Sequence, residues 1–153
     1  MNKRCLTIDI RSYLFVPQRD DRYHHTLWII DLNKMSRSIT IWYSKNAEDT
    51  NIEIGNHYMF GTQKSSKSFW AQEVLKEIGV NKLSELGDFD PIYFSGWDQL
   101  NILNNEIKLI EDNIDKLKYD QDQITEWIKN LKFCCDKLIR TATEDSIPNL
   151  MIG

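Results

Sequence analysis

Two heptad seams in the last third of the chain decide its fold: LNILNNEIKLIEDNIDKL at residues 100–117 and ITEWIKNLKFCCDKL at residues 124–138. Apolar residues recur at spacings of 3, 4, 3, 4 and 3 in the first seam and of 4, 3, 4 and 3 in the second. Such spacing places them along one face of a helix. The polar segment Tyr119–Gln123 is long enough only to connect two helices, so we expect a C-terminal antiparallel helical hairpin over residues 98–142.

Upstream of the hairpin, the first 62 residues follow a different period. Apolar and polar residues alternate there, as in half-buried strands. The pattern predicts an N-terminal antiparallel sheet of about four strands within residues 1–62. The expected strands cover residues 6–16, His25–Leu32, Ser38–Lys45 and Asn51–Phe60, the last of them interrupted at Gly55 by a bulge.

Three further elements complete the expected α+β domain, which spans residues 1–153. Apolar residues at i, i+3, i+4 and i+7 predict one amphipathic helix over residues 65–79. The segment Gly87–Gly96 is typical of a loop or a short strand, and the tail Thr143–Gly153 is expected to be irregular.

The composition is typical of a single globular domain. Of the 153 residues, 41% are apolar and 27% are charged. No apolar run exceeds four residues, so we expect no membrane-spanning helix, no secretory signal and no membrane partner. Cys5, Cys134 and Cys135 do not form a disulfide framework, which favours a cytoplasmic location.

Charge is distributed unevenly along the chain. The net charge is −4, which does not suggest a nucleic-acid binder, and residues 98–126 hold eight acids against three bases. Glu111 with Asp115, and Asp122 with Glu126, are expected to lie i, i+4 on helices, where like charges cost about 0.2–0.5 kcal/mol per pair. A basic protein partner would be steered toward such a surface.

We therefore predict a partner-binding surface made of acids and one aromatic anchor. Trp42 is the candidate anchor, because it alternates with Ile41 and Tyr43 on its strand and is either covered by a helix or exposed to a partner. The predicted partner-binding residues are Glu111, Asp112, Asp115, Asp120, Asp122, Glu126 and Trp42.

Patterns typical of catalysis are not found. The sequence has no glycine-rich phosphate loop, no nucleophile elbow and no H-E-x-x-H motif. The segment that holds Asp20, Asp21, His24 and His25 reads as a polar loop rather than a metal site. Cys134 and Cys135 read as structural thiols, with Cys135 buried in the second seam. We expect no cofactor, no metal and no catalytic residue.

The C-terminal part resembles the ends of small immunity proteins from bacterial polymorphic-toxin and contact-dependent growth inhibition systems. The resemblance lies in Ser95–Leu117, which opens with S-G-W-D-Q-L, in the W-I-K-N-L of residues 127–131, and in the closing S-I-P-N-L-M-I-G of residues 146–153. It implies a non-enzymatic cytoplasmic protein that binds and neutralises a cognate toxin domain. The class has no catalytic residues to carry over.

Two alternatives stay open. One is a small nuclease-like enzyme that would use Arg4, Arg11, His24 or His57 in one pocket. The other is an acidic regulator from a mobile element, or a DNA mimic, whose carboxylates would be spaced like backbone phosphates. Neither the oligomeric state nor the identity of the toxin follows from the sequence.

Overall fold

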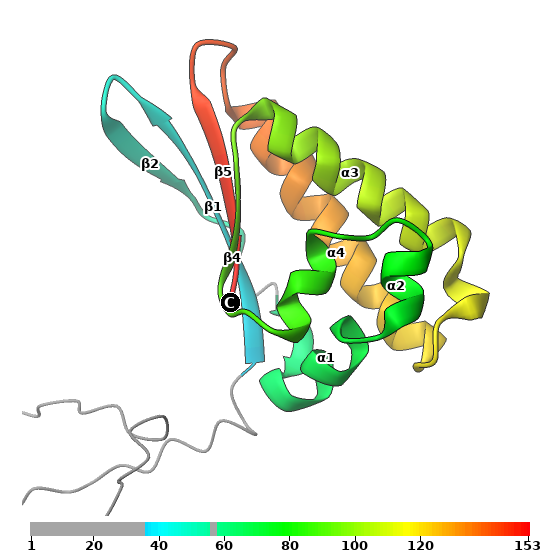
Figure 1. The fold of residues 1–153 in the computed structure, drawn as a ribbon. Helices are drawn as coiled ribbons and strands as arrows, with labels where there is room; N and C mark the ends of the chain where they lie inside the picture. Colours follow the sequence, from blue (N-terminus) through cyan, green and yellow to red (C-terminus); the bar gives the residue numbers. More distant parts are fainter. Residues whose placement is uncertain (1–35, 56–57) are drawn as a thin grey trace, which may run out of the picture.

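An antiparallel sheet lies against one layer of helices in the computed structural model, which describes residues 36–55 and 58–153 (Figure 1). The chain thus has the predicted α+β class. The strands are β1 (Ser36–Lys45), β2 (Glu48–Ile52), β3 (Tyr58–Thr62), β4 (Ile92–Ser95) and β5 (Ile147–Ile152). The helices are α1 (Gln63–Trp70), α2 (Glu73–Glu77), α3 (Trp97–Asp112) and α4 (Gln121–Thr141), with 3-10 turns η2 (Leu83–Gly87) and η3 (Ile114–Lys116).

The C-terminal strand β5 lies inside the sheet, so the prediction of an irregular tail is wrong. The strand order is β2-β1-β5-β4, and Leu150 lies opposite Ile41 of β1 and Phe94 of β4. Pro148 lacks an N–H and is unusual in a central strand. The Pro148 carbonyl accepts from the Gly96 N–H at 2.8 Å, and Gly96 follows the last residue of β4. The N–H that Pro148 lacks would therefore have had no partner within β4.

The other edge of β1 pairs with β2 and β3. β2 pairs with the second half of β1 and β3 with its start, around an interruption that contains Gly55 at φ +69°. The strand predicted at Ser38–Lys45 is confirmed. The prediction of one strand over Asn51–Phe60 with a bulge at Gly55 is wrong, because β2 and β3 are separate strands on either side of the segment that contains Gly55. The strands predicted at 6–16 and His25–Leu32 lie outside the described residues.

The single helix predicted over residues 65–79 is wrong, because the chain breaks into α1 and α2 at Ala71 and Gln72. Gln72 has an extended backbone, and its side chain forms hydrogen bonds both with α1 and with the hairpin connection. Its Nε2 donates to the Phe69 carbonyl at 3.1 Å, and its Oε1 accepts from the Lys118 N–H at 3.0 Å. The break is therefore stabilised by the hairpin connection, which lies far along the chain.

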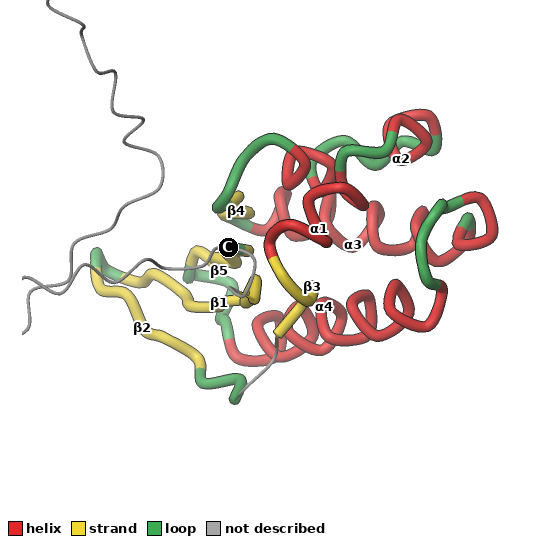
Figure 2. The backbone as a smooth tube through the Cα atoms, turned by 90° about the horizontal axis from the view of Figure 1, so that it is seen from below, coloured by secondary structure: helices red, strands yellow, loops and turns green. Residues whose placement is uncertain are grey.

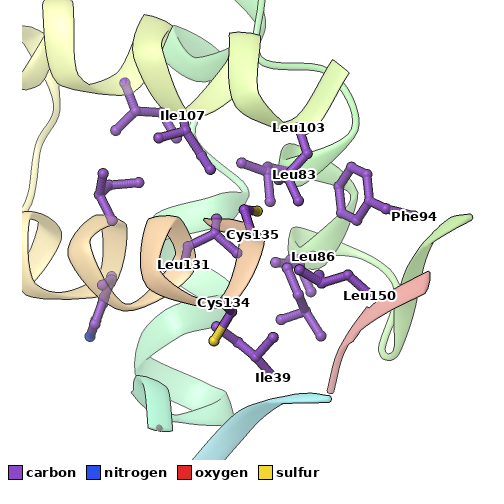
Figure 3. Close-up of a cluster of buried hydrophobic side chains, with 14 of the residues drawn as sticks. Ile39, Leu83, Leu86, Phe94, Leu103, Ile107, Leu131, Cys134, Cys135 and Leu150 are labelled. Atoms are coloured by element: carbon purple, nitrogen blue, oxygen red, sulfur yellow. The ribbon is translucent and has the colours of Figure 1, made fainter. Parts of the chain in front are cut away.

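The predicted hairpin is confirmed: α3 and α4 run antiparallel, joined by η3 and a short connection (Figure 1). All the helices that the structure describes lie on the same side of the sheet (Figure 2). In Figure 3 Cys134 points toward Ile39 of β1, and Cys135 points toward Leu83 and Leu103. Both thiols are thus in the core, because α4 packs on the sheet with one face and on α3 with another. None of the described helices is long and apolar enough to cross a bilayer.

Substitutions at neighbouring positions of β5 test its place in the sheet. Leu150 is fully buried toward the helices, whereas Met151 is half-buried on the opposite face. We expect Leu150→Ala to lower the free energy of unfolding by about 3 kcal/mol through lost burial and a cavity, and Met151→Ala by about 1 kcal/mol or less. Urea unfolding followed by tryptophan fluorescence measures both. Equal, small losses would contradict a central β5.

Candidate functional site

The acidic segment, residues 98–126, covers α3, the turn of the helical hairpin and the start of α4, and core contacts hold the turn in place. Leu117 is buried in the middle of the connection. The Tyr119 ring lies 5.4 Å from Phe69 and 5.2 Å from Trp127, measured between centroids. The exposed carboxylates around these anchors are therefore carried on an ordered scaffold, so a partner would not have to order this backbone on binding.

Three of the predicted acids have structural roles within the hairpin that explain their presence without a partner. Asp120 is the N-cap of α4 and accepts from the Gln123 N–H at 2.8 Å. Asp122 lies in the first turn of α4, where the helix dipole favours a negative charge. Glu111 forms an ion pair with Lys132 across the hairpin, with its two oxygens at 2.9 and 3.0 Å from Nζ.

The other three predicted acids are Asp112, Asp115 and Glu126. All three are exposed, and none forms an ion pair with a residue that the structure describes. Over residues 111–126 the chain carries six acids against two lysines. One of the lysines, Lys116, donates to the Asn113 side chain at 2.6 Å.

One of the two predicted like-charge pairs is wrong. Helix α3 ends at Asp112, with Asn113 as its C-cap, and Asp115 belongs to the separate turn η3. Glu111 and Asp115 are therefore not i, i+4 neighbours on one helix. Asp122 and Glu126 do both lie on α4, so the second pair is as predicted.

Glu106 also belongs to the acidic segment, yet it is a buried structural residue. Its Oε1 accepts from the Asn81 and Lys82 N–H groups at 2.8 and 2.7 Å, and its Oε2 accepts from the Leu83 N–H at 2.7 Å. It thereby satisfies the donors at the start of η2 and joins that turn to α3. One of the eight acids thus adds nothing to the surface.

A small apolar depression lies between α3 and α4 beside the exposed acids. It has a volume of about 250 Å³, and its lining includes Ile110, Ile114 and Ile128, with Glu111 and Thr125. Ile110 and Ile128 are buried and Ile114 is half-buried. The depression can accept one apolar side chain, or the methylene stem of a lysine or arginine, with the Glu111 carboxylate in its lining.

Trp42 lies on a different surface from the acids. It alternates with the buried Ile41 and is half-buried on the sheet face that points away from the helices. The exposed Tyr93 and Ile147 are on the same face by register, at 52% and 55% exposure. The structure therefore separates the predicted aromatic anchor from the acidic hairpin turn.

The vicinal cysteines are buried, as predicted for Cys135, and Cys134 is buried as well. Burial raises the pKa of Cys134 to about 11 and that of Cys135 to about 12. Both groups are thus neutral thiols at pH 7.

The residues of the enzyme hypothesis and of the considered metal site are not part of the described structure. Arg4, Arg11, His24 and His57 of the enzyme hypothesis, and the segment with Asp20 and His25, lie outside the described residues. In residues 36–55 and 58–153 no three His, Cys, Asp or Glu side chains are grouped so that they could hold a metal ion.

Comparison with known protein families, with curated proteins and with solved structures finds no match to this chain.

The sequence alone missed the depression and the role of Glu106. Ile114 and Thr125 come from opposite arms of the hairpin, and only the register between α3 and α4 brings them together. Glu106 precedes the seam residue Ile107, and this position next to the apolar face was a sign that its side chain could be covered.

Removing one carboxylate oxygen tests the role of Glu106. We expect Glu106→Gln to lower the free energy of unfolding by about 2–3 kcal/mol, because an amide N–H₂ would then face buried N–H donors. Glu111→Gln on the same helix is the matched control and should cost less than about 1 kcal/mol, since it removes only an exposed ion pair. Chemical denaturation of both variants gives the comparison. Equal costs would mean that Glu106 does not hold η2.

Thiol reactivity tests the burial of the cysteine pair. We expect neither Cys134 nor Cys135 to react with iodoacetamide at pH 8 in the native state, and both to react in urea, as read by peptide mass mapping. A raised pKa favours the neutral thiol in the folded state. The stability that the buried neutral thiols contribute is therefore complete below the ordinary cysteine pKa of 9.0, and it is lost as the pH rises from there toward 11–12. Rapid native labelling would contradict the placement of α4.

Proposed function

We propose that this chain is a non-enzymatic immunity protein that binds and neutralises a cognate toxin domain in the cytoplasm, through the acidic turn of its hairpin. The observation that carries the proposal is the apolar depression lined by Ile110, Ile114 and Ile128, with Glu111 in its lining and further exposed acids next to its lining residues in the sequence. Interfaces commonly combine an apolar anchor pocket with a charged rim.

Charge supports a basic partner. Asp112, Asp115 and Glu126 are exposed, have no local ion pair in the described structure, and flank residues that line the depression. A cluster of like charges costs stability unless a partner offsets it. Toxin domains that act on nucleic acids carry cationic surfaces for their substrate, and they would fit this chemistry.

The resemblance to immunity proteins supports the same function. Ser95–Leu117 includes α3 and η3, residues 127–131 lie in α4, and residues 146–153 contain β5. The first two segments border the depression, since Ile110, Ile114 and Ile128 lie within them. The third holds the sheet on which the hairpin packs.

Charge reversal of the turn tests the proposal. We expect replacement of Asp112, Asp115, Asp122 and Glu126 by Lys to slow association with the toxin domain and to remove most of its salt dependence, because rim charges act mainly on the association rate. The fold should survive, since all four side chains are exposed. Stopped-flow association at low and high salt, after co-purification of the wild-type pair, is the measurement.

A matched control carries the same change in charge elsewhere. Replacement of Glu73, Glu77, Asp136 and Glu144 by Lys also reverses four exposed acids, and it should slow association much less. Equal effects of the two quadruple variants would indicate net charge rather than this surface. Wild-type association by the hairpin variant would move the interface to the sheet face of Trp42.

The choice of partner is also a test. An immunity gene is expected directly downstream of a gene for a large secreted protein with a variable C-terminal domain, and that domain is the probe. A neighbourhood without such a gene would contradict the immunity function. Specific capture of a DNA-binding protein that duplex DNA displaces would instead favour the DNA-mimic alternative.

A further inference from the structure

A second cavity opens at the N-terminal end of α1, away from the hairpin turn. The start of β1, the first turns of α1 and the segment that leads into β4 come together there, near the C-terminal end of the chain (Figure 1). Its volume is about 300 Å³. Its polar lining consists of Arg37, Gln63, Lys64, Lys67, Asp88 and Asp90.

Arg37 is the unusual member of this lining, because it is a buried cation with an unused donor. Its side chain is 2% exposed. Nη2 donates to the Leu86 carbonyl at 3.0 Å, and Nε lies 3.3 Å from Asp90 Oδ2, an ion pair without the alignment of a hydrogen bond. Nη1 has no hydrogen-bond partner among the described residues. Buried donors are rarely left unpaired, since each costs about 1–3 kcal/mol.

The helix that forms one wall adds positive potential. Helix α1 has eight residues, Thr62 as its N-cap, and no acid in its first turn. The Thr62 Oγ1 accepts from the Ser65 N–H at 3.2 Å, so the cap satisfies one donor. Lys64 and Lys67 lie one helical turn apart, and both line the cavity. N–H groups at a helix start, together with basic side chains, favour an anion.

The opposite wall carries acids, which limits the excess of positive charge. Asp90 is committed to Arg37. Asp88 is exposed and pairs with no base in the described part of the chain. The lining thus holds three cations and two carboxylates, and Arg37 and Asp90 among them already form an ion pair. Phe89, between these acids, lines the cavity and is 64% exposed, so its ring is accessible to a ligand.

We propose that this cavity binds the phosphate group of a small phosphorylated ligand, with Arg37 at its base, Lys64 and Lys67 on the α1 wall, and Phe89 against the organic part. A tetrahedral oxyanion can accept from several donors at once, and guanidinium and ammonium groups are the usual partners of phosphate. The site is independent of the proposed immunity function, because it shares no residue with the hairpin surface.

NMR titration of the full-length, 15N-labelled chain tests the proposal, with inorganic phosphate and adenosine 5′-monophosphate as probes at constant ionic strength. We expect saturable shifts confined to the amides of residues 62–67 and 86–90. Adenosine 5′-monophosphate should bind more tightly than phosphate, and adenosine alone should not bind. Equal affinity for the two phosphates would reduce the site to a free-phosphate site and overturn the role of Phe89.

Variants separate a built site from general attraction. Replacement of Lys64 and Lys67 by Gln should weaken binding about tenfold or more, because charge-assisted hydrogen bonds are lost. Replacement of Lys76 and Lys108 by Gln removes the same charge from exposed positions on α2 and α3 and should leave the affinity unchanged. Both pairs are at the surface or rim, so folding is not at risk.

Two further outcomes would overturn the proposal. The first is the absence of saturable shifts at millimolar phosphate. The second is an equal loss of affinity in both lysine pairs, which would show non-specific attraction of an anion. Phe89→Ala, which alters an exposed side chain, should weaken adenosine 5′-monophosphate binding and spare inorganic phosphate.

Discussion

The pairing of β5 with both β1 and β4 is the constraint on which the rest of the structure depends. β4 has no other strand partner among those described, and α3 begins directly after it, so the place of α3 is set by β5. The Trp97 Nε1 donates to the Ser146 carbonyl at 3.2 Å and ties the start of α3 to the start of β5. At the other end, Ser38 and Gly153 exchange backbone hydrogen bonds of 2.8 and 3.1 Å, which extends the β1–β5 ladder. Segments more than 100 residues apart in the chain thereby enclose one core.

How much could be predicted from the sequence depends on whether the information is local. The hairpin and the strand at Ser38–Lys45 follow from periodicity, which each segment carries by itself. The break at Gln72 and the strand at Ile147–Ile152 could not be predicted in this way, because a backbone N–H of Lys118 and two distant strands decide them. The acidic site, too, was predictable only where the information is local. Exposure of most of the acids follows from the seam, whereas the burial of Glu106 and the depression follow from packing between segments.

The structure also separates two explanations of the acidic segment that are merged in the sequence. Asp120, Asp122 and Glu111 serve α4 and the hairpin itself, as cap, dipole partner and ion pair. These roles would exist without any partner. The remaining exposed acids, Asp112, Asp115 and Glu126, have no such local role in the described structure, and each is the sequence neighbour of a residue that lines the apolar depression. The case for a binding surface therefore depends on three carboxylates and a groove, rather than on the whole negative charge of residues 98–126.

The short turn η2 connects the core to the cationic cavity. Glu106 accepts from the N–H groups at its start, and Arg37 donates to the Leu86 carbonyl near its end, so a carboxyl group and a guanidinium group lie at opposite ends of its dipole. Along the side of η2, Gly87 packs closely against the end of α1: a Cβ atom added at Gly87 would lie 2.8 Å from the Ala71 backbone. The loop that follows is thus fixed at its base, and with it Asp88 and Phe89 at the rim of the cavity. An arginine needed only to hold η2 would use its donors on Leu86 and Asp90. Arg37 lines a preformed cavity, and its buried Nη1 has no hydrogen-bond partner among the described residues, which suits an oxyanion ligand better than a purely structural role.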